Sequence, residues 1–350
     1  MAFKSIWIQI VLYILFAGVL VGCESVRYYN QLISGQMTIL NKKQPIKQVL
    51  LEPHIPSKLK EQLGLVLEIR EFAKNDLFLP VDDHYLNFVD LERPFVLWSV
   101  YATPEFSLTP KTWCYPIVGC VSYRGYFSEE NAHAFEAKLK QQGYDVFVGG
   151  VAAYSTLGWF DDPVLNTFVY RNEIKLAALI FHEVAHQLLY VKNDTTFNES
   201  FATAVAQEGL RRWLQTKNDI RDFSDYQTDF QRHQEFIQLV MKYRKQLELL
   251  YAQDLSISNM RKAKSVIYND LSDEYRRLKQ QWNGFSGYDR WFSNALNNAK
   301  LISVATYYDL VPAFLKLLQN NRYDLKQFYT NCQNLAKKTE KERRIYLEQF

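Results

Sequence analysis

Residues 174–191 decide the fold, and they read Ile-Lys-Leu-Ala-Ala-Leu-Ile-Phe-His-Glu-Val-Ala-His-Gln-Leu-Leu-Tyr-Val. On a helix this run is apolar almost all the way round, which is typical of a helix buried in the centre of a protein. Asn172 lies just upstream and is a residue type that favours the start of a helix. The sequence therefore predicts a central helix that begins after Asn172 and is covered on every side.

This helix carries an H-E-x-x-H motif formed by His182, Glu183 and His186. Residues four apart on a helix lie one above the other, with about 5–6 Å between their Cβ atoms. Two imidazoles placed in this way can bind one Zn²⁺ ion. Glu183 would lie beside the ion, where it can take a proton from water and pass it to a leaving amine. The alternative is a solvated helix face, but the flanking residues are apolar and unpaired polar groups among them would be costly.

A catalytic zinc site needs a third protein ligand and an open position. Thr195 or Thr196 can cap a second helix over about 197–214. An antiparallel return of that helix would bring Glu199, in its first turn, opposite His186. We therefore predict one zinc ion bound by both histidines and Glu199.

Other polar residues downstream could complete the site. Glu208 is the second choice for the third ligand, His233 is a further candidate, and Asp194 could orient a ligand imidazole from outside the coordination sphere. Hydrolysis also needs a donor that stabilises the transition state. Tyr307, Tyr308 and His233 are candidates, and we choose Tyr307, although most of the 23 tyrosines must serve packing alone.

Residues 1–22 have the features of a lipoprotein signal peptide. The apolar run Ile6–Val21 is shorter than the roughly 20 residues that a membrane-spanning helix needs. It ends in Leu20-Val21-Gly22-Cys23, which resembles a bacterial lipobox, so Cys23 is the predicted lipidation site. The alternative is an uncleaved anchor helix. Both interpretations predict an exported protein attached to a bacterial membrane.

The residues after the lipobox agree with export. Glu24 favours an outer-membrane destination that faces the periplasm, because by resemblance to known sorting an Asp there indicates inner-membrane retention. In that oxidising compartment, Cys114 and Cys120 are expected to form a short-loop disulfide, with a metal site as the weaker alternative. Cys332 is then left as a buried thiol.

Composition excludes several classes of protein. Of the 350 residues, 48% are hydrophobic and 23% are charged, which excludes intrinsic disorder. The net charge of only +3 gives no reason to expect a nucleic-acid partner. Aromatic residues make up 15%, which is ample for a large core.

Periodicity divides the chain into a mixed part and a helical part. We expect a tether or N-terminal segment over 23–55, a catalytic core over 56–220 and a helical C-terminal region over 221–350. In the core, apolar spacing predicts helices over 56–72 and 129–142 and strands over 95–100, 118–126 and 144–148, the last ended by Gly149-Gly150. The expected helices of the C-terminal region cover 230–251, 259–282 and 294 onward, with a bend at Pro312.

Several sequence blocks together resemble the family of putative bacterial aminopeptidases, which are zincins with a lipobox. The blocks are residues 113–116 (Trp-Cys-Tyr-Pro), 119–127 (Gly-Cys-Val-Ser-Tyr-Arg-Gly-Tyr-Phe), 153–160 (Ala-Tyr-Ser-Thr-Leu-Gly-Trp-Phe), 182–187 and 197–202 (Phe-Asn-Glu-Ser-Phe-Ala). The resemblance implies an α+β zincin-like metallopeptidase core that hydrolyses peptides. It also implies His182, His186 and Glu199 as ligands, in a gluzincin-like pattern, and Glu183 as the catalytic base.

The chain departs from better-known zinc aminopeptidases at one point. Those enzymes carry a Gly-Ala-Met-Glu-Asn segment whose Glu binds the substrate amine, and this sequence lacks it. Glu105 or Glu173 could bind an amine instead, and residues 151–157 are either an edge strand that pairs with substrate or an ordinary core strand. Two alternatives therefore stay open: an endopeptidase of the cell envelope, and a lipoprotein adaptor whose zincin core is not catalytic.

Overall fold

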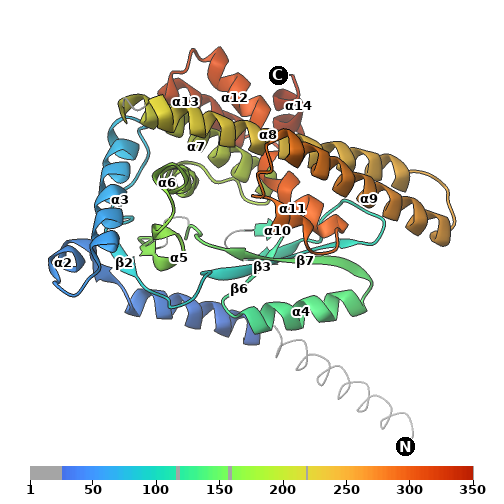
Figure 1. Ribbon diagram of the computed structural model, residues 1–350, viewed down its shortest axis with the longest axis horizontal. Coiled ribbons are helices and arrows are strands. Elements are labelled where there is room, and N and C mark those ends of the chain that lie inside the picture. Colours follow the sequence, from blue (N-terminus) through green and yellow to red (C-terminus); the bar gives the residue numbers. More distant parts are fainter. Residues whose placement is uncertain (1–25, 116–118, 157–159, 218–219, 350) are drawn as a thin grey trace, which may run out of the picture.

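The computed structural model describes residues 26–115, 119–156, 160–217 and 220–349 (Figure 1). It shows a mixed α+β protein in which small sheets are surrounded by helices. The predicted signal peptide over 1–22, the predicted lipidation site Cys23 and part of the predicted segment 151–157 lie outside the described residues. In the part of the chain that is described, no helix is both long enough and apolar enough to span a membrane.

The main sheet has the strand order β6-β3-β7, and all its pairs are antiparallel. Its central strand β3 (Leu97–Pro104) pairs along its whole length with β7 (Tyr144–Val151), and β6 (Arg124–Tyr126) lies on its other side. The predicted break at Gly149-Gly150 is wrong, because both glycines pair with β3 and the strand continues to Val151. A side chain at Gly150 would overlap the ring of Phe95, so this glycine serves close packing within the strand.

The smaller sheets join segments that are distant in sequence. The predicted strand over 118–126 is in fact two, because β5 (Gly119–Val121) turns away from β6 to pair with β4 (Trp113–Tyr115). A disulfide joins Cys114 to Cys120 directly across this pair. The third sheet combines β1 (Gln44–Pro45), β2 (Asn87–Val89) and β8 (Val164–Leu165).

Helices cover both faces of the main sheet. Helix α4 (Glu129–Gln141) packs on one face, and α11 (Asn298–Tyr308) packs on the other (Figure 1). The helical residues 26–41 lie on the same side as α4 and hydrogen bond to Gly125 and Phe127. The N-terminal segment is thus docked on the body.

The predicted buried helix is α6 (Glu173–Leu188), and Asn172 caps it by accepting a hydrogen bond from the backbone of Lys175. It packs against α7 (Thr195–Lys217), the second predicted helix. The predicted cap by Thr195 or Thr196 is wrong, since the carboxylate of Asp194 accepts from the backbone N–H of Phe197.

Around this helix pair lies the main core. Helix α3 (Ser57–Asn75) packs on α6, and α12 (Val311–Asn320) packs on α7, with Pro312 in its first turn. Helices α13 (Leu325–Ala336) and α14 (Glu340–Leu347) complete the same core. Residues on either side of the predicted 220/221 boundary therefore share one core. The remaining short helices are α2 (Ile46–Leu51), α5 (Asn166–Val169) and α10 (Asp289–Phe292).

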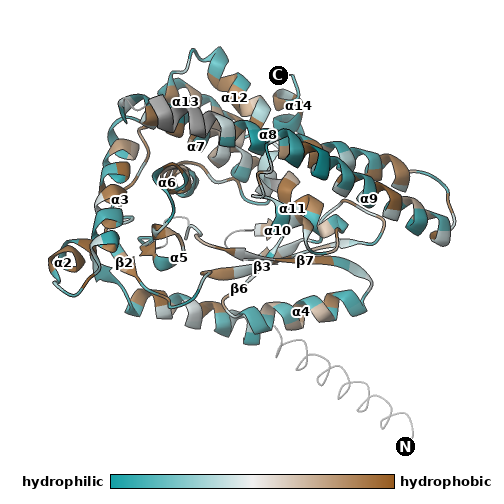
Figure 2. Cartoon of the chain, in the orientation of Figure 1, coloured by the Kyte–Doolittle hydropathy of each residue, from teal (hydrophilic) through white to brown (hydrophobic). Residues whose placement is uncertain are grey.

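A second core lies between the two long helices α8 (Ile220–Tyr251) and α9 (Ile257–Gln281), which also contact α11. Hydrophobic and hydrophilic residues alternate along both helices (Figure 2), as expected of amphipathic helices with one covered face. Residues 230–251 and 259–282 were predicted to form such helices, and the structure confirms both, although α8 begins ten residues earlier than predicted, at Ile220.

Candidate functional site

The antiparallel pair α6–α7 brings His182, His186 and Glu199 together. The Nε2 atoms of the two histidines lie 3.2 Å apart. Oε2 of Glu199 lies 3.2 Å from Nε2 of His182 and 3.6 Å from Nε2 of His186. These three are the group of possible metal ligands found among the described residues, with one ligand atom of each lying within 4.8 Å of the others.

A clasp at the turn between the helices fixes Glu199. The side chain of Asn198 accepts a hydrogen bond of 2.7 Å from the backbone N–H of Val191 and donates one of 2.8 Å to its carbonyl. Asn198 is buried, so these bonds satisfy two backbone groups that water does not reach. Because Glu199 is the next residue, the clasp sets where its carboxylate enters the site.

The three side chains fit a metal ion. All are buried or nearly so, and two ring nitrogens with one carboxylate oxygen form a donor set that zinc accepts while keeping a position open. The lone pairs of these two nitrogens and this oxygen lie so close together that they repel one another unless a proton or a cation lies between them. Nδ1 of His182 lies 3.5 Å from the hydroxyl of Thr203, which can hold the ring in place. Nδ1 of His186 is buried and has no hydrogen-bond partner among the described residues, so the ring's polar contacts there are made by Nε2.

The charges of the site depend on one another. Burial alone would raise the pKa of Glu199, but His186 and His182 outweigh it and lower that pKa to about 2. For His186, burial lowers the pKa, but the charge and hydrogen bond of Glu199 together with the charge of Glu183 outweigh burial, so the pKa is raised. The carboxylate is thus negative and attracts a positive charge at the point where the three side chains meet.

Glu183 lies next to this group but is not part of it. Its side chain is buried, and burial raises the pKa of its carboxyl, with the charges of Glu199 and Asp162 acting in the same direction. A carboxylate with a raised pKa accepts a proton more readily, which is the property of a general base.

The site opens into two hollows. A cavity of 510 Å³ with mostly apolar walls extends from His182 and Glu183 toward the helical residues 26–41. A larger groove of 1030 Å³ extends from the same two residues between α6, α7 and α8. Residues that line both hollows include Val151, Ala153 and Tyr307. A chain lying across the site can therefore extend to both sides of it.

Of the predicted donors, Tyr307 lies closest to the ligand group. Its ring centroid is 6.3 Å from that of His182. Burial raises the pKa of its phenol, which therefore keeps its proton. Tyr308 and His233 instead form a hydrogen bond with each other, with 2.7 Å between Oη of the tyrosine and Nε2 of the histidine. Burial lowers the pKa of His233 to about 4. Both residues line the groove.

Asp162 is a positioning residue that the sequence analysis missed. Its carboxylate accepts hydrogen bonds from the backbone and hydroxyl of Thr156, and from Gln187, which directly follows His186. Its backbone N–H donates to Nδ1 of His84. Asp162 thus ties the loop after β7 to the site helix. Among the described residues of the predicted segment 151–157, Val151 alone belongs to a strand, and residues 152–156 form this tied loop.

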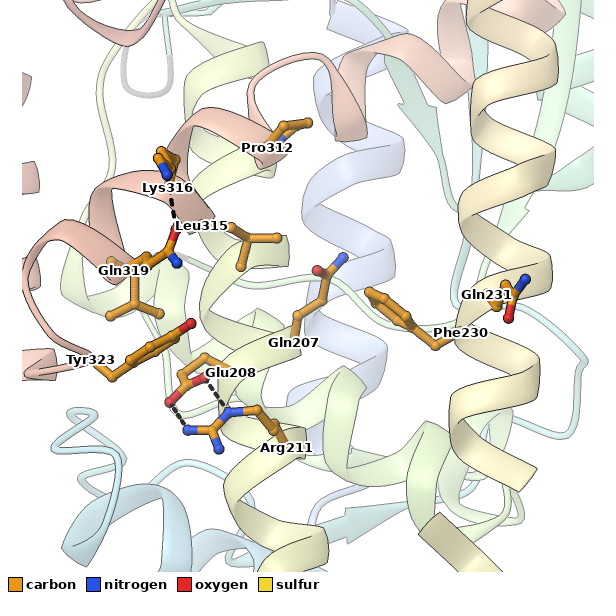
Figure 3. Close-up of a pocket in the computed structure, with 11 residues that line it drawn as sticks. Gln207, Glu208, Arg211, Phe230, Gln231, Pro312, Leu315, Lys316, Gln319 and Tyr323 are labelled. Atoms are coloured by element: carbon orange, nitrogen blue, oxygen red, sulfur yellow. Dashed lines mark hydrogen bonds and ion pairs between the residues drawn. The ribbon is translucent and has the colours of Figure 1, made fainter. Parts of the chain in front are cut away.

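Two other predicted residues have different partners. Asp194 does not orient an imidazole, because its carboxylate accepts hydrogen bonds of 2.6 and 2.9 Å from Arg343 of α14. Glu208 points away from the histidines into a separate pocket of 880 Å³ between α7, α8 and α12, where it binds Arg211 (Figure 3) and Arg212.

The two candidate amine binders also differ. The carboxylate of Glu105 accepts from Arg261 of α9, and Glu105 is not among the residues that line the groove or the apolar cavity. Glu173 lines the groove, where its carboxylate accepts a hydrogen bond from the indole N–H of Trp213.

These observations define an α+β protein with a possible metal site on a buried helix pair, open to two hollows. The chain belongs to the family described as putative aminopeptidases, whose sequence model matches residues 27–347. Comparisons with curated proteins and with solved structures gave no match.

The Asn198 clasp leads to a prediction about stability. Asn198→Ala should leave the buried backbone N–H of Val191 unpaired, which costs about 1–3 kcal/mol, while the Val191 carbonyl keeps its hydrogen bond from the backbone of Asp194. We therefore expect the free energy of unfolding, measured with denaturant, to fall by about 1–3 kcal/mol. Asn334→Ala on the exposed face of α13 is the control and should change it by about 0.5 kcal/mol or less. Equal effects of the two substitutions would contradict the clasp.

Proposed function

We propose that the protein is a zinc-dependent peptidase and, following its family, an aminopeptidase. The observation that carries the proposal is the convergence of His182, His186 and Glu199 beside Glu183, on a buried helix that opens into two hollows. A bound zinc ion would polarise the scissile carbonyl and lower the pKa of a water molecule.

In this mechanism the chain's own residues move the protons. Glu183 takes a proton from the attacking water as the new C–O bond forms, and its raised pKa suits that step. It then passes the proton to the amine nitrogen as the C–N bond breaks. Tyr307, which stays protonated, can donate a hydrogen bond to the carbonyl oxygen as negative charge develops there.

The sheet offers a place for the substrate backbone. Among the described strands, β7 pairs only with β3, so its other edge is not covered by a strand. Its last residue, Val151, lines both hollows beside the site. An extended peptide could add to this edge by β-augmentation. The apolar cavity would then receive a hydrophobic side chain of that peptide.

The alternatives are an envelope endopeptidase and a lipoprotein adaptor without catalysis. Glu105 and Glu173 both have partners of their own, so neither is favoured as an amine binder, and this keeps endopeptidase action open. A structural zinc is usually enclosed by four protein ligands. The described residues supply three and leave the site open to both hollows, which supports the enzyme over the adaptor.

We also propose where this chemistry takes place. The lipobox at Cys23 supports a lipid anchor in the bacterial cell envelope, with the body in the periplasm at the outer membrane. Its partners would then be the membrane and peptide substrates. The nearly balanced charge of the chain supports no nucleic-acid partner.

The roles of Glu183 and His186 can be separated by substitution. Glu183→Gln should keep the bound zinc, because Glu183 is not a ligand, and should lower kcat by about 10²–10⁴-fold, because the general base is lost. His186→Ala should lose both the zinc and the activity. Metal analysis and peptide turnover measure the two effects, and His133→Ala on the surface of α4 is the control.

Retained turnover in the Glu183→Gln variant would refute the base assignment. Retained zinc in the His186→Ala variant would refute the ligand assignment. The control should leave both quantities unchanged.

Blocked substrates distinguish exopeptidase from endopeptidase action. An aminopeptidase should cleave a peptide with a free amine and should leave its N-acetylated counterpart intact, because the blocked form lacks the charged group that must be bound. Mass spectrometry of the products from matched peptide pairs measures this. Equal cleavage within both peptides would instead establish the endopeptidase.

The apolar cavity predicts a preference for hydrophobic side chains. Leu97→Trp should fill part of the cavity and lower kcat/KM by about 10-fold or more for peptides with a large apolar residue beside the cleaved bond. Peptides with alanine at that position should be affected much less. Leu255→Trp, at an exposed position outside the cavity, is the control. An equal loss for both kinds of peptide would contradict the assignment of this cavity.

A further inference from the structure

The helical residues 26–41 expose an apolar stripe to the surroundings. Val26, Tyr29, Ile33 and Met37 are 58%, 40%, 62% and 47% exposed. Their spacing of three and four residues places them on one helical face within an arc of about 80°. Arg27 is the only charged residue in 26–41, and it lies to one side of this arc. We call these four residues the apolar stripe.

The opposite face of the helix is fixed to the body, so the stripe stays outward. Tyr28 shares a hydrogen bond of 2.9 Å with the hydroxyl of Tyr115, and the guanidinium of Arg124 lies 3.9 Å from its ring centroid. Gly35 lies so close to Phe127 that any side chain there would overlap the ring. Rotating the helix to bury the stripe would break all these contacts.

The preceding sequence indicates what covers the stripe. Cys23 is three residues from Val26, and an extended chain spans at most about 3.6 Å per residue, so the two are within about 11 Å. The apolar run Ile6–Val21 comes directly before. Either a lipid on Cys23 or an uncleaved anchor would therefore bring the bilayer to the start of this helix.

We propose that the apolar stripe docks on the membrane surface, with the helical residues 26–41 lying in the interface. The acyl chains of a lipidated cysteine hold the chain at the bilayer, and the stripe adds a second contact that fixes the orientation of the body on its surface. Tyr29 of the stripe also lines the apolar cavity that reaches His182 and Glu183. One end of the cavity would thus open beside the lipid headgroups, toward substrates held at the membrane.

This inference rests on the envelope anchoring proposed above and is independent of peptidase activity. It is tested on the full chain, reconstituted into phosphatidylethanolamine and phosphatidylglycerol vesicles whose acyl chains carry bromine, a quencher of tryptophan fluorescence. Ile33→Trp and, separately, Met37→Trp place a reporter on the stripe. Val266→Trp places one on α9 at a position that is 56% exposed and serves as the control.

We expect bromine to quench roughly half or more of the fluorescence added at positions 33 and 37, because an interfacial helix buries its apolar face about 5–10 Å into the headgroup and acyl boundary. The fluorescence added at position 266 should stay unquenched. Quenching at all three positions, or at none, overturns the proposal. Shielding of the stripe reporters from both bromine and aqueous iodide would indicate a protein partner or a second copy of the chain, and also overturns it.

Discussion

The structure depends on one constraint: two imidazoles and a carboxylate are buried together inside an apolar core. His186 and Glu199 are buried and His182 nearly so, and each needs the others, because an uncompensated polar group in this position would be costly. The constraint requires α7 to run antiparallel to α6 and to begin close to the C-terminal end of α6. The clasp of Asn198 on Val191 and the capping of α7 by Asp194 provide that return.

The elements that surround helices α6 and α7 leave the candidate site open on two sides. Asp162 ties the loop after β7 to Gln187 on the site helix, and so keeps Val151 and Ala153 beside the ligand group. On the far side, α11 packs between the sheet and α7 and brings Tyr307 against His182. The elements around the candidate site thus come from segments more than 150 residues apart in the sequence, and the main sheet serves as their common support.

The helical C-terminal part contributes to the core as well as extending it. Arg343 of α14 binds Asp194, which caps the site-bearing helix α7, so the end of the described chain stabilises the turn that positions Glu199. Phe314 of α12 stacks edge-on against Phe197 and Phe201 of the same helix. The hairpin α8–α9 has its own core, yet His233 and Tyr288 of this part line the groove.

The sequence by itself determined the local features. It predicted the buried helix, its Asn172 cap, the spacing of His182 and His186 and the following helix with Glu199, because helical periodicity and capping are encoded within a few residues. Only the tertiary structure decided which distant groups meet. No local pattern could show that Asp194 pairs with Arg343 or that Asp162 joins the loop after β7 to Gln187, since these contacts depend on how segments far apart in the chain pack. Glu208, by contrast, pairs with Arg211 on its own helix, at a spacing that the sequence shows. Secondary structure and helix caps depend on neighbouring residues. The partners of buried charged side chains depend instead on the tertiary packing that excludes water from those side chains.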